Sequence, residues 1–283
     1  MLDPSLPSAV PSLMRRQYPA AVLYISAAVI TFFFPLSVSF LPFLWKIIAY
    51  SGCAGVLAVF RILQKKQTAG QPDDPARPAL LWLLIIHLYY PVAVFLEWVL
   101  PFSFLGVSYL PVTIVLTVLL LTAPSWKPHG KWFRTGSFTG GTVILILLVA
   151  VFSGAALYLW QLLLQPDLSD FFSMMPSGGA VLLLLAGFGF AVTNAFVEEM
   201  FFRGFFWYRL EGQKVLQVVV TALLFGFLPI RGFPGGAVGV GMVFVWGLFL
   251  ALLRRRTGGM LAPYIAHVVA DMTIFGILCG LYY

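Results

Sequence analysis

Charged residues are scarce in this sequence. Asp, Glu, Lys and Arg make up 10% of the 283 residues, whereas hydrophobic residues make up 61%. No soluble domain covers that much apolar surface, so the composition excludes a soluble globular protein. Only two cysteines occur, Cys53 and Cys279. Each lies inside an apolar run, and both are therefore interpreted as small buried residues rather than as a disulfide or a metal-binding pair.

Several apolar runs reach the roughly 20 residues that a helix needs to cross a bilayer. We therefore predict an all-α fold, a polytopic transmembrane helical bundle with about nine spans. The predicted spans are 18–38, 43–63, 79–100, 104–123, 140–164, 177–202, 214–230, 235–253 and 260–282. Residues 1–17 are predicted to be a disordered tail, residues 18–164 an N-terminal group of membrane helices, and residues 177–283 the domain that holds the functional site.

Basic residues are distributed unequally between the two sides of this predicted bundle. All of the 17 Lys and Arg residues except Lys46 and Arg231 fall on one side, whereas Glu97, Asp167 and Asp170 lie on the other. Cytoplasmic loops carry such an excess, so the N-terminus is predicted to be cytoplasmic. The net charge of +7 then reflects topology, and no nucleic-acid partner is expected. The two halves show no repeat, which disfavours a transporter.

The segment Asn194–Tyr208 places ionisable groups at the end of an otherwise apolar run. Such groups are costly at membrane depth and usually face the protein interior. On a helix, Glu199 and Arg203 are four residues apart and share a face. Glu198 points about 100° away and aligns with Asn194 one turn earlier. Arg203 is thus expected to neutralise Glu199 while Glu198 stays available for chemistry. The alternative is a buried ion pair that only joins two helices.

A second polar pair, His267 and Asp271, lies in the last predicted span. The two residues are four apart, so both side chains project from one face into the bundle. His267 lies roughly 10 Å from the basic loop Arg254–Arg256, which precedes this span, at 1.5 Å per residue. Glu198 reaches the same depth from an antiparallel helix. A carboxylate in an apolar pocket is suited to deprotonate water. A His–Asp hydrogen bond that only fixes the span is the alternative.

Two further features are interpreted as packing. His87 lies between apolar residues of the third predicted span, where a hydrogen-bonded core histidine is expected rather than a ligand. The glycines of 232–241 have the look of a phosphate loop but lack its Lys-Ser/Thr. Gly235 and Gly239 are four apart and predict a face on which membrane helices pack closely.

Three motifs carry a resemblance to a known family. The sequence Glu198-Glu-Met-Phe-Phe-Arg203-Gly resembles the EExxxR motif of the CPBP family, the CAAX-protease and bacteriocin-processing intramembrane peptidases. The segment from Phe225 to Pro229 is similar to the second motif, a Phe followed four residues later by His. The segment from His267 to Asp271 resembles the third, a His followed four residues later by Asn or sometimes Asp. Order and spacing agree from residue 177 to the end of the chain.

The resemblance implies an intramembrane endopeptidase that cleaves membrane-anchored polypeptides, multi-pass in a plasma membrane of prokaryotic type. Its partners would be a membrane-anchored protein or peptide substrate and the lipid bilayer. In that scheme Glu198 activates water and is supported by Glu199 and Arg203. His267 helps to hold the water or the oxyanion, and Asp271 stabilises the oxyanion. The expected site residues are Glu198, Glu199, Arg203, His267 and Asp271, with Asn194 and Phe225 in support.

Two departures from the family pattern leave alternatives open. Pro229 stands where the second motif has His and offers no side-chain donor, acceptor or ligand. Asp271 donates to an oxyanion only when protonated. Asp271 and Asn194 are the candidates to replace the missing imidazole. With one imidazole left, a zinc site of three protein ligands would need two carboxylates, so no metal or other cofactor is expected.

The rival functions come from different classes of protein. The first is a catalytically inactive relative that binds membrane proteins as a scaffold or regulator, which Pro229 favours. The second is a proton-coupled transporter with Glu198, Glu199 and His267 as its relay, which the missing repeat disfavours. The complete EExxxR motif favours the peptidase.

Overall fold

The computed structural model describes residues 42–67, 134–173, 175, 179–207, 210, 213–231 and 233–282. Within these ranges every regular element is a helix and none is a strand, which confirms the predicted all-α class. The chain divides into two compact units, Met1–Val94 and Phe95–Tyr283.

The described part of the first unit is one helix, α2 (Phe43–Gln67). It corresponds to the predicted span 43–63, and its apolar part, Leu44–Val59, is shorter than a full membrane span. The predicted tail 1–17 and the predicted spans 18–38, 79–100 and 104–123 lie outside the described residues.

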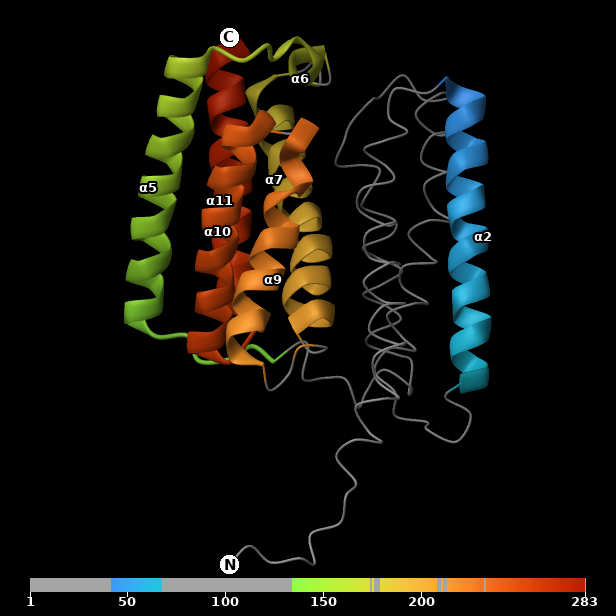
Figure 1. Cartoon of the computed structure of the whole chain (residues 1–283). Coiled ribbons are helices and arrows are strands. Elements are labelled where there is room, and N and C mark those ends of the chain that lie inside the picture. Colours follow the sequence, from blue (N-terminus) through green and yellow to red (C-terminus); the bar gives the residue numbers. More distant parts are fainter. Residues whose placement is uncertain are drawn as a thin grey trace, which may run out of the picture. The chain divides into compact units, whose positions relative to one another are not determined.

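The second unit is a bundle in which α5, α7, α9, α10 and α11 stand side by side (Figure 1). Its elements are α5 (Gly140–Leu164), α6 (Ser169–Ser173), α7 (Ala180–Glu199), the π-helix η2 (Met200–Phe206), α9 (Lys214–Gly226), the 3-10 turn η3 (Leu228–Arg231), α10 (Gly236–Thr257) and α11 (Leu261–Tyr282). Helix α11 contacts α5, α7 and α10, while α9 packs mainly on α10. The C-terminus lies at the same end of this bundle as α6 (Figure 1).

Four described helices are long and apolar enough to cross a membrane: Gly140–Leu164, Ala180–Gly204, Gly236–Thr257 and Leu261–Leu281. Helix α5 carries Val151, Phe152 and Leu163, which are 70%, 71% and 78% exposed. Side chains of this kind belong in lipid rather than water. The chain is a membrane protein.

The predicted span 214–230 is too long. Helix α9 has 13 residues and is therefore only about 20 Å long at 1.5 Å per residue, less than the ~30 Å hydrocarbon core. The helix ends at Gly226, and Pro229 follows in η3 at φ −86° and ψ 23°. Proline lacks the N–H that would continue the helix ladder. The count of nine spans and the cytoplasmic N-terminus stay predictions.

Local sequence signals explain the ends of the long helices. Thr139 caps α5 by a reciprocal capping box with Thr142. Gly258 ends α10 in the left-handed region at φ 66°, where its N–H bonds to the Arg254 carbonyl. The basic side chains in the last turn of α10 complement the negative end of the helix dipole. Pro263 lies in the first turn of α11, where a missing N–H costs little.

The segment before α5 is tied to the connection between α10 and α11. Ser137 N donates to Thr257 O at 2.8 Å, and Met260 N donates to Arg134 O at 2.6 Å. A Cβ on Gly136 (φ 76°) or on Gly259 would overlap the backbone of the opposite segment. Both positions therefore require glycine, and residues far apart in sequence are fixed together at this end of the bundle.

Two helices approach each other closely at glycines other than the predicted ones. A Cβ on Gly226 would meet the backbone of Phe244, and one on Gly247 would meet the backbone of Ala222, so these two glycines let α9 and α10 approach. Gly239 instead abuts the carbonyl of Pro234, in the loop before its own helix. The prediction of a helix-packing face is therefore wrong for Gly239, which meets the turn that leads into α10. Gly235 is the N-cap of that helix.

Candidate active site

The acid pair lies where α7 passes into the π-helix η2 without a break. Arg203 Nη1 donates to Glu199 Oε1 at 2.9 Å, and the two side chains are 0% and 1% exposed. The predicted ion pair is thus present and fully buried. Arg203 Nη2 also donates to the Gly247 carbonyl at 3.2 Å, which ties the end of α7 to α10. π-Helical turns inside α-helices are frequent at functional sites.

Two arginines that the topology prediction placed in loops belong to the bundle. Arg203 is fully buried, and Arg254 is 6% exposed on α10. Arg254 interacts electrostatically with Glu199. Both side chains therefore lie in the interior of the protein, and the prediction that Arg203 and Arg254 lie in cytoplasmic loops is corrected.

Phe225 on α9 packs against both the arginine and the histidine. The Arg203 guanidinium lies 4.4 Å from the centroid of its ring, at the distance of a cation–π contact. The ring of His267 meets the same ring edge-on, with 5.4 Å between centroids. Phe225 thus packs against two of the predicted site residues and limits their movement.

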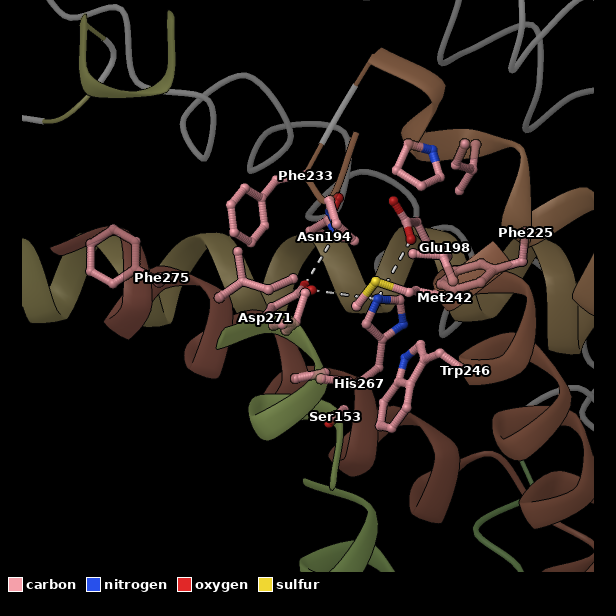
Figure 2. Close-up of a pocket in the computed structure, with 18 of the residues that line it drawn as sticks. Ser153, Asn194, Glu198, Phe225, Phe233, Met242, Trp246, His267, Asp271 and Phe275 are labelled. Atoms are coloured by element: carbon pink, nitrogen blue, oxygen red, sulfur yellow. Dashed lines mark hydrogen bonds and ion pairs between the residues drawn. The ribbon is translucent and has the colours of Figure 1, made fainter. Parts of the chain in front are cut away.

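His267 on α11 contacts all three acidic side chains of the site. Its Nδ1 lies 2.8 Å from Glu199 Oε1, the atom that also accepts from Arg203. Its Nε2 lies 3.5 Å from Glu198 Oε2 and 3.6 Å from Asp271 Oδ1. Figure 2 shows the imidazole below Glu198 and beside Asp271. The antiparallel helices α7 and α11 therefore bring the two predicted polar pairs to the same depth.

Asn194 completes the polar cluster from one turn before Glu198. Its Nδ2 donates to Asp271 Oδ2 at 3.1 Å, which joins α7 to α11. Figure 2 shows Asn194, Asp271, His267 and Glu198 arranged around a common space. All seven residues predicted for the site lie together in the second unit.

A cavity of about 820 Å³ adjoins this cluster. Its polar lining residues are Ser153, Asn194, Glu198, His267 and Asp271, and apart from the indole N–H of Trp246 the rest of its wall is apolar. Glu198 lines the cavity and its side chain is 21% exposed, whereas Glu199 and Arg203 lie behind the wall. Pro229 also lines the cavity. The position of the missing histidine therefore faces the site.

Within the described ranges, no group of three or more His, Cys, Asp and Glu side chains has the geometry of a metal site. Glu199 Oε2 and Arg203 Nε are buried without a hydrogen-bond partner among these residues. The ion pair is thus formed by one atom of each side chain, Arg203 Nη1 and Glu199 Oε1, while Arg203 Nη2 donates to the Gly247 carbonyl.

Helix α10 contributes to the site in a way that the sequence did not reveal. Met242 and Trp246 line the cavity, and the Gly247 carbonyl accepts from Arg203. None of these groups belongs to a motif or carries a charge. The only available signal was the glycine at 247, because small residues allow close helix contact.

A comparison with protein-family models gives one match to this chain. Residues 180–273 match the family described as "Type II CAAX prenyl endopeptidase Rce1-like". The matched region begins with α7 and ends two residues after Asp271, so it contains the whole polar cluster. No curated protein and no solved structure matches the chain. The predicted resemblance to the CPBP family is confirmed over residues 180–273, which match the model of its Rce1-like CAAX endopeptidases.

Proposed function

We propose that the chain is an intramembrane endopeptidase in which Glu198 is the general base that activates water. The observation that carries this proposal is the different environment of the two adjacent acids. Glu199 is bound by Arg203 and by His267 Nδ1, while Glu198 faces the cavity. A general base must lie within reach of the proton that it abstracts, and Glu198 is the acid of the pair that an entering water can reach.

In this mechanism Glu199 and Arg203 orient the histidine. A carboxylate that accepts from one ring nitrogen fixes the rotation of the imidazole and leaves the other nitrogen for chemistry. Here Nδ1 is held by Glu199, so Nε2 of His267 is directed toward Glu198 and the cavity. Arg203 keeps the Glu199 carboxylate in place and is itself held by the Gly247 carbonyl.

Hydrolysis then proceeds through a tetrahedral intermediate. Glu198 takes a proton from water as the water oxygen bonds to the scissile carbonyl carbon, whose electron pair moves to the carbonyl oxygen. The carbonyl re-forms as the C–N bond breaks, and Glu198 passes its proton to the leaving amine. His267 accepts a hydrogen bond from the water through Nε2, or donates one to the oxyanion through this atom when the imidazole is protonated. Every electrostatic contribution is larger in an apolar site that excludes bulk water.

The cavity suits a peptide segment brought in by a membrane anchor. Its wall is mostly apolar, and its polar groups gather at Glu198, His267 and Asp271. The family description names prenyl endopeptidases, so a peptide carrying an S-prenyl cysteine is the first substrate to examine. We place the protein in a plasma membrane of prokaryotic type and propose that it needs no cofactor, because Glu198 serves as the base.

A scaffold or regulator without catalysis is the second candidate. The observation in its favour is Pro229, which is buried in the wall of the cavity where the family motif has His. A site that lacks one imidazole can still bind a membrane protein without cleaving it.

The test uses the full chain in detergent micelles with a fluorogenic, internally quenched peptide anchored by an S-prenyl cysteine. We expect cleavage by the wild type and a loss of at least ~10²-fold in rate for Glu198→Gln. The matched control is Asp167→Asn, outside the membrane helices. A hydrogen bond from the Ser169 backbone lowers the pKa of Asp167, so this control also removes one negative charge.

Cleavage by Glu198→Gln at the wild-type rate would remove the general-base assignment. A wild type that binds the peptide but leaves it intact would support the scaffold instead. Equal thermal unfolding temperatures for the wild type, Glu198→Gln and Asp167→Asn would show that the comparison concerns chemistry rather than folding.

A further inference from the structure

The site lacks the neutral donors that the family motifs provide. Pro229 replaces a histidine and Asp271 replaces the more usual asparagine of the third motif. A carboxylate at 271 accepts hydrogen bonds but donates none when ionised. A developing oxyanion therefore needs a donor from elsewhere in the cavity.

Among the residues that line the cavity, Asn194 is the carboxamide. It lies one helical turn before Glu198, and Figure 2 shows it above the space between Asp271 and His267. A carboxamide nitrogen carries two hydrogens. One of them is donated to Asp271 Oδ2 at 3.1 Å, and no other described residue receives a hydrogen bond from this side chain.

We propose that Asn194 donates its second amide hydrogen to the oxyanion, and that Asp271 acts as a positioning residue that holds the amide in place. This inference rests on the proposed peptidase function. Asp271 accepts from Asn194 through Oδ2 and lies 3.6 Å from His267 Nε2 through Oδ1. The carboxyl oxygen fixes the orientation of the amide, and a fixed donor needs no reorganisation when charge develops on the substrate.

In the reaction the carbonyl electron pair moves to oxygen as the water oxygen adds to carbon and Glu198 takes the proton. The resulting oxyanion accepts from the Asn194 amide. Collapse returns the electron pair, breaks the C–N bond and transfers the proton from Glu198 to the leaving amine. The negative charge on the carbonyl oxygen develops only in the transition state, so the contribution of Asn194 belongs to kcat rather than to substrate binding.

The first experiment measures kcat and KM for Asn194→Ala on the S-prenyl peptide. We expect kcat to fall by about 10²–10³-fold, the effect of removing one oxyanion donor, with KM nearly unchanged. The matched control is Tyr264→Phe. Tyr264 Oη donates to the Val192 carbonyl at 3.2 Å, so this change also deletes one hydrogen bond between α11 and α7, but outside the cavity. We expect Tyr264→Phe to keep the wild-type kcat.

The second experiment is a rescue. Asp271→Asn returns a neutral amide to the third motif, so Asn194→Ala/Asp271→Asn should recover most of the lost kcat. The exchanged pair Asn194→Asp/Asp271→Asn keeps one amide and one carboxylate between the two helices and should also be active. If Asn194→Ala does not fold, the kcat of this exchanged pair tests the proposal instead.

The inference is overturned if folded Asn194→Ala keeps kcat within about threefold of the wild type, far below the expected effect. It is also overturned if the double variants fold but remain as inactive as Asn194→Ala. Failure of the peptidase proposal would look different, because the wild type and Glu198→Gln would then release equal fluorescence.

Discussion

Glu199 on α7 and His267 on α11 share one short contact, 2.8 Å between Oε1 and Nδ1, at the atom that also accepts from Arg203. One carboxylate oxygen thus receives both a guanidinium and an imidazole, and the next acid in the sequence is left to face the cavity. The chemistry proposed for Glu198 depends on this division between adjacent side chains.

Arg203→Ala should lower stability as well as activity. It removes the cation from Glu199, which is 1% exposed, and breaking a buried pair costs about 3–5 kcal/mol because the remaining charge is uncompensated. The free energy of unfolding in mixed micelles would measure the loss of stability. The control is Arg255→Ala, an exposed residue of α10, where about 0.5 kcal/mol or less is expected. Equal stability of the two variants would contradict a supporting role for the ion pair.

Pro229→His should raise the rate of cleavage. The position is buried and lines the cavity, and its φ of −86° is open to any residue. A positioned acid–base group contributes about 10²–10⁴-fold, and we expect at least ~10-fold here. Pro229→Ala is the control and should give no gain. A folded Pro229→His with unchanged kcat would show that this position does not serve the reaction.

Gly226→Ala should destabilise the contact between α9 and α10. A Cβ at this position would lie 2.9 Å from the Phe244 Cα, and overpacking of this kind costs about 1–3 kcal/mol. Gly241→Ala on α10 is the matched control, because nothing lies within 4 Å of its Cβ position. Thermal unfolding of both variants would provide the comparison. A lower unfolding temperature for Gly241→Ala than for Gly226→Ala would contradict this packing.

The predicted topology can be measured with single cysteines in a chain whose Cys53 and Cys279 are replaced by alanine. Cysteines at Lys66, Lys131 and Arg255 should react with a membrane-impermeant maleimide only after the cytoplasmic face is exposed. Cysteines in the 165–176 loop should react in intact cells. The reverse pattern would invert the orientation inferred from the basic residues.

Spacing along one helix could be predicted from the sequence. The contact between Glu199 and Arg203 follows from a separation of four residues, and so does the proximity of His267 to Asp271. Both pairs are present. Each needs only a helical backbone, and the apolar runs predict that backbone well.

Contacts between helices could not be predicted in the same way. Whether His267 Nδ1 meets Glu199 or Glu198 depends on how α7 and α11 are rotated about their axes, and side-chain packing sets that rotation. Helix rotation also determines two other contacts. These are the hydrogen bond from Asn194 to Asp271 and the hydrogen bond from Arg203 to the Gly247 carbonyl. The π-helical turn at Met200–Phe206 could not be predicted either, because the apolar pattern was interpreted with the α-helical period of 3.6 residues per turn.

The three-residue connection between α10 and α11 restricts how the length of the chain can change. It is held by backbone bonds from Met260 to Arg134 and from Ser137 to Thr257, and α11 begins at Leu261. One residue inserted after this anchor would turn the helix by about 100° and advance it by about 1.5 Å. His267 would then rotate away from Glu199. Insertions and deletions at this connection are therefore unsuitable for engineering, although loops at a membrane surface usually tolerate them.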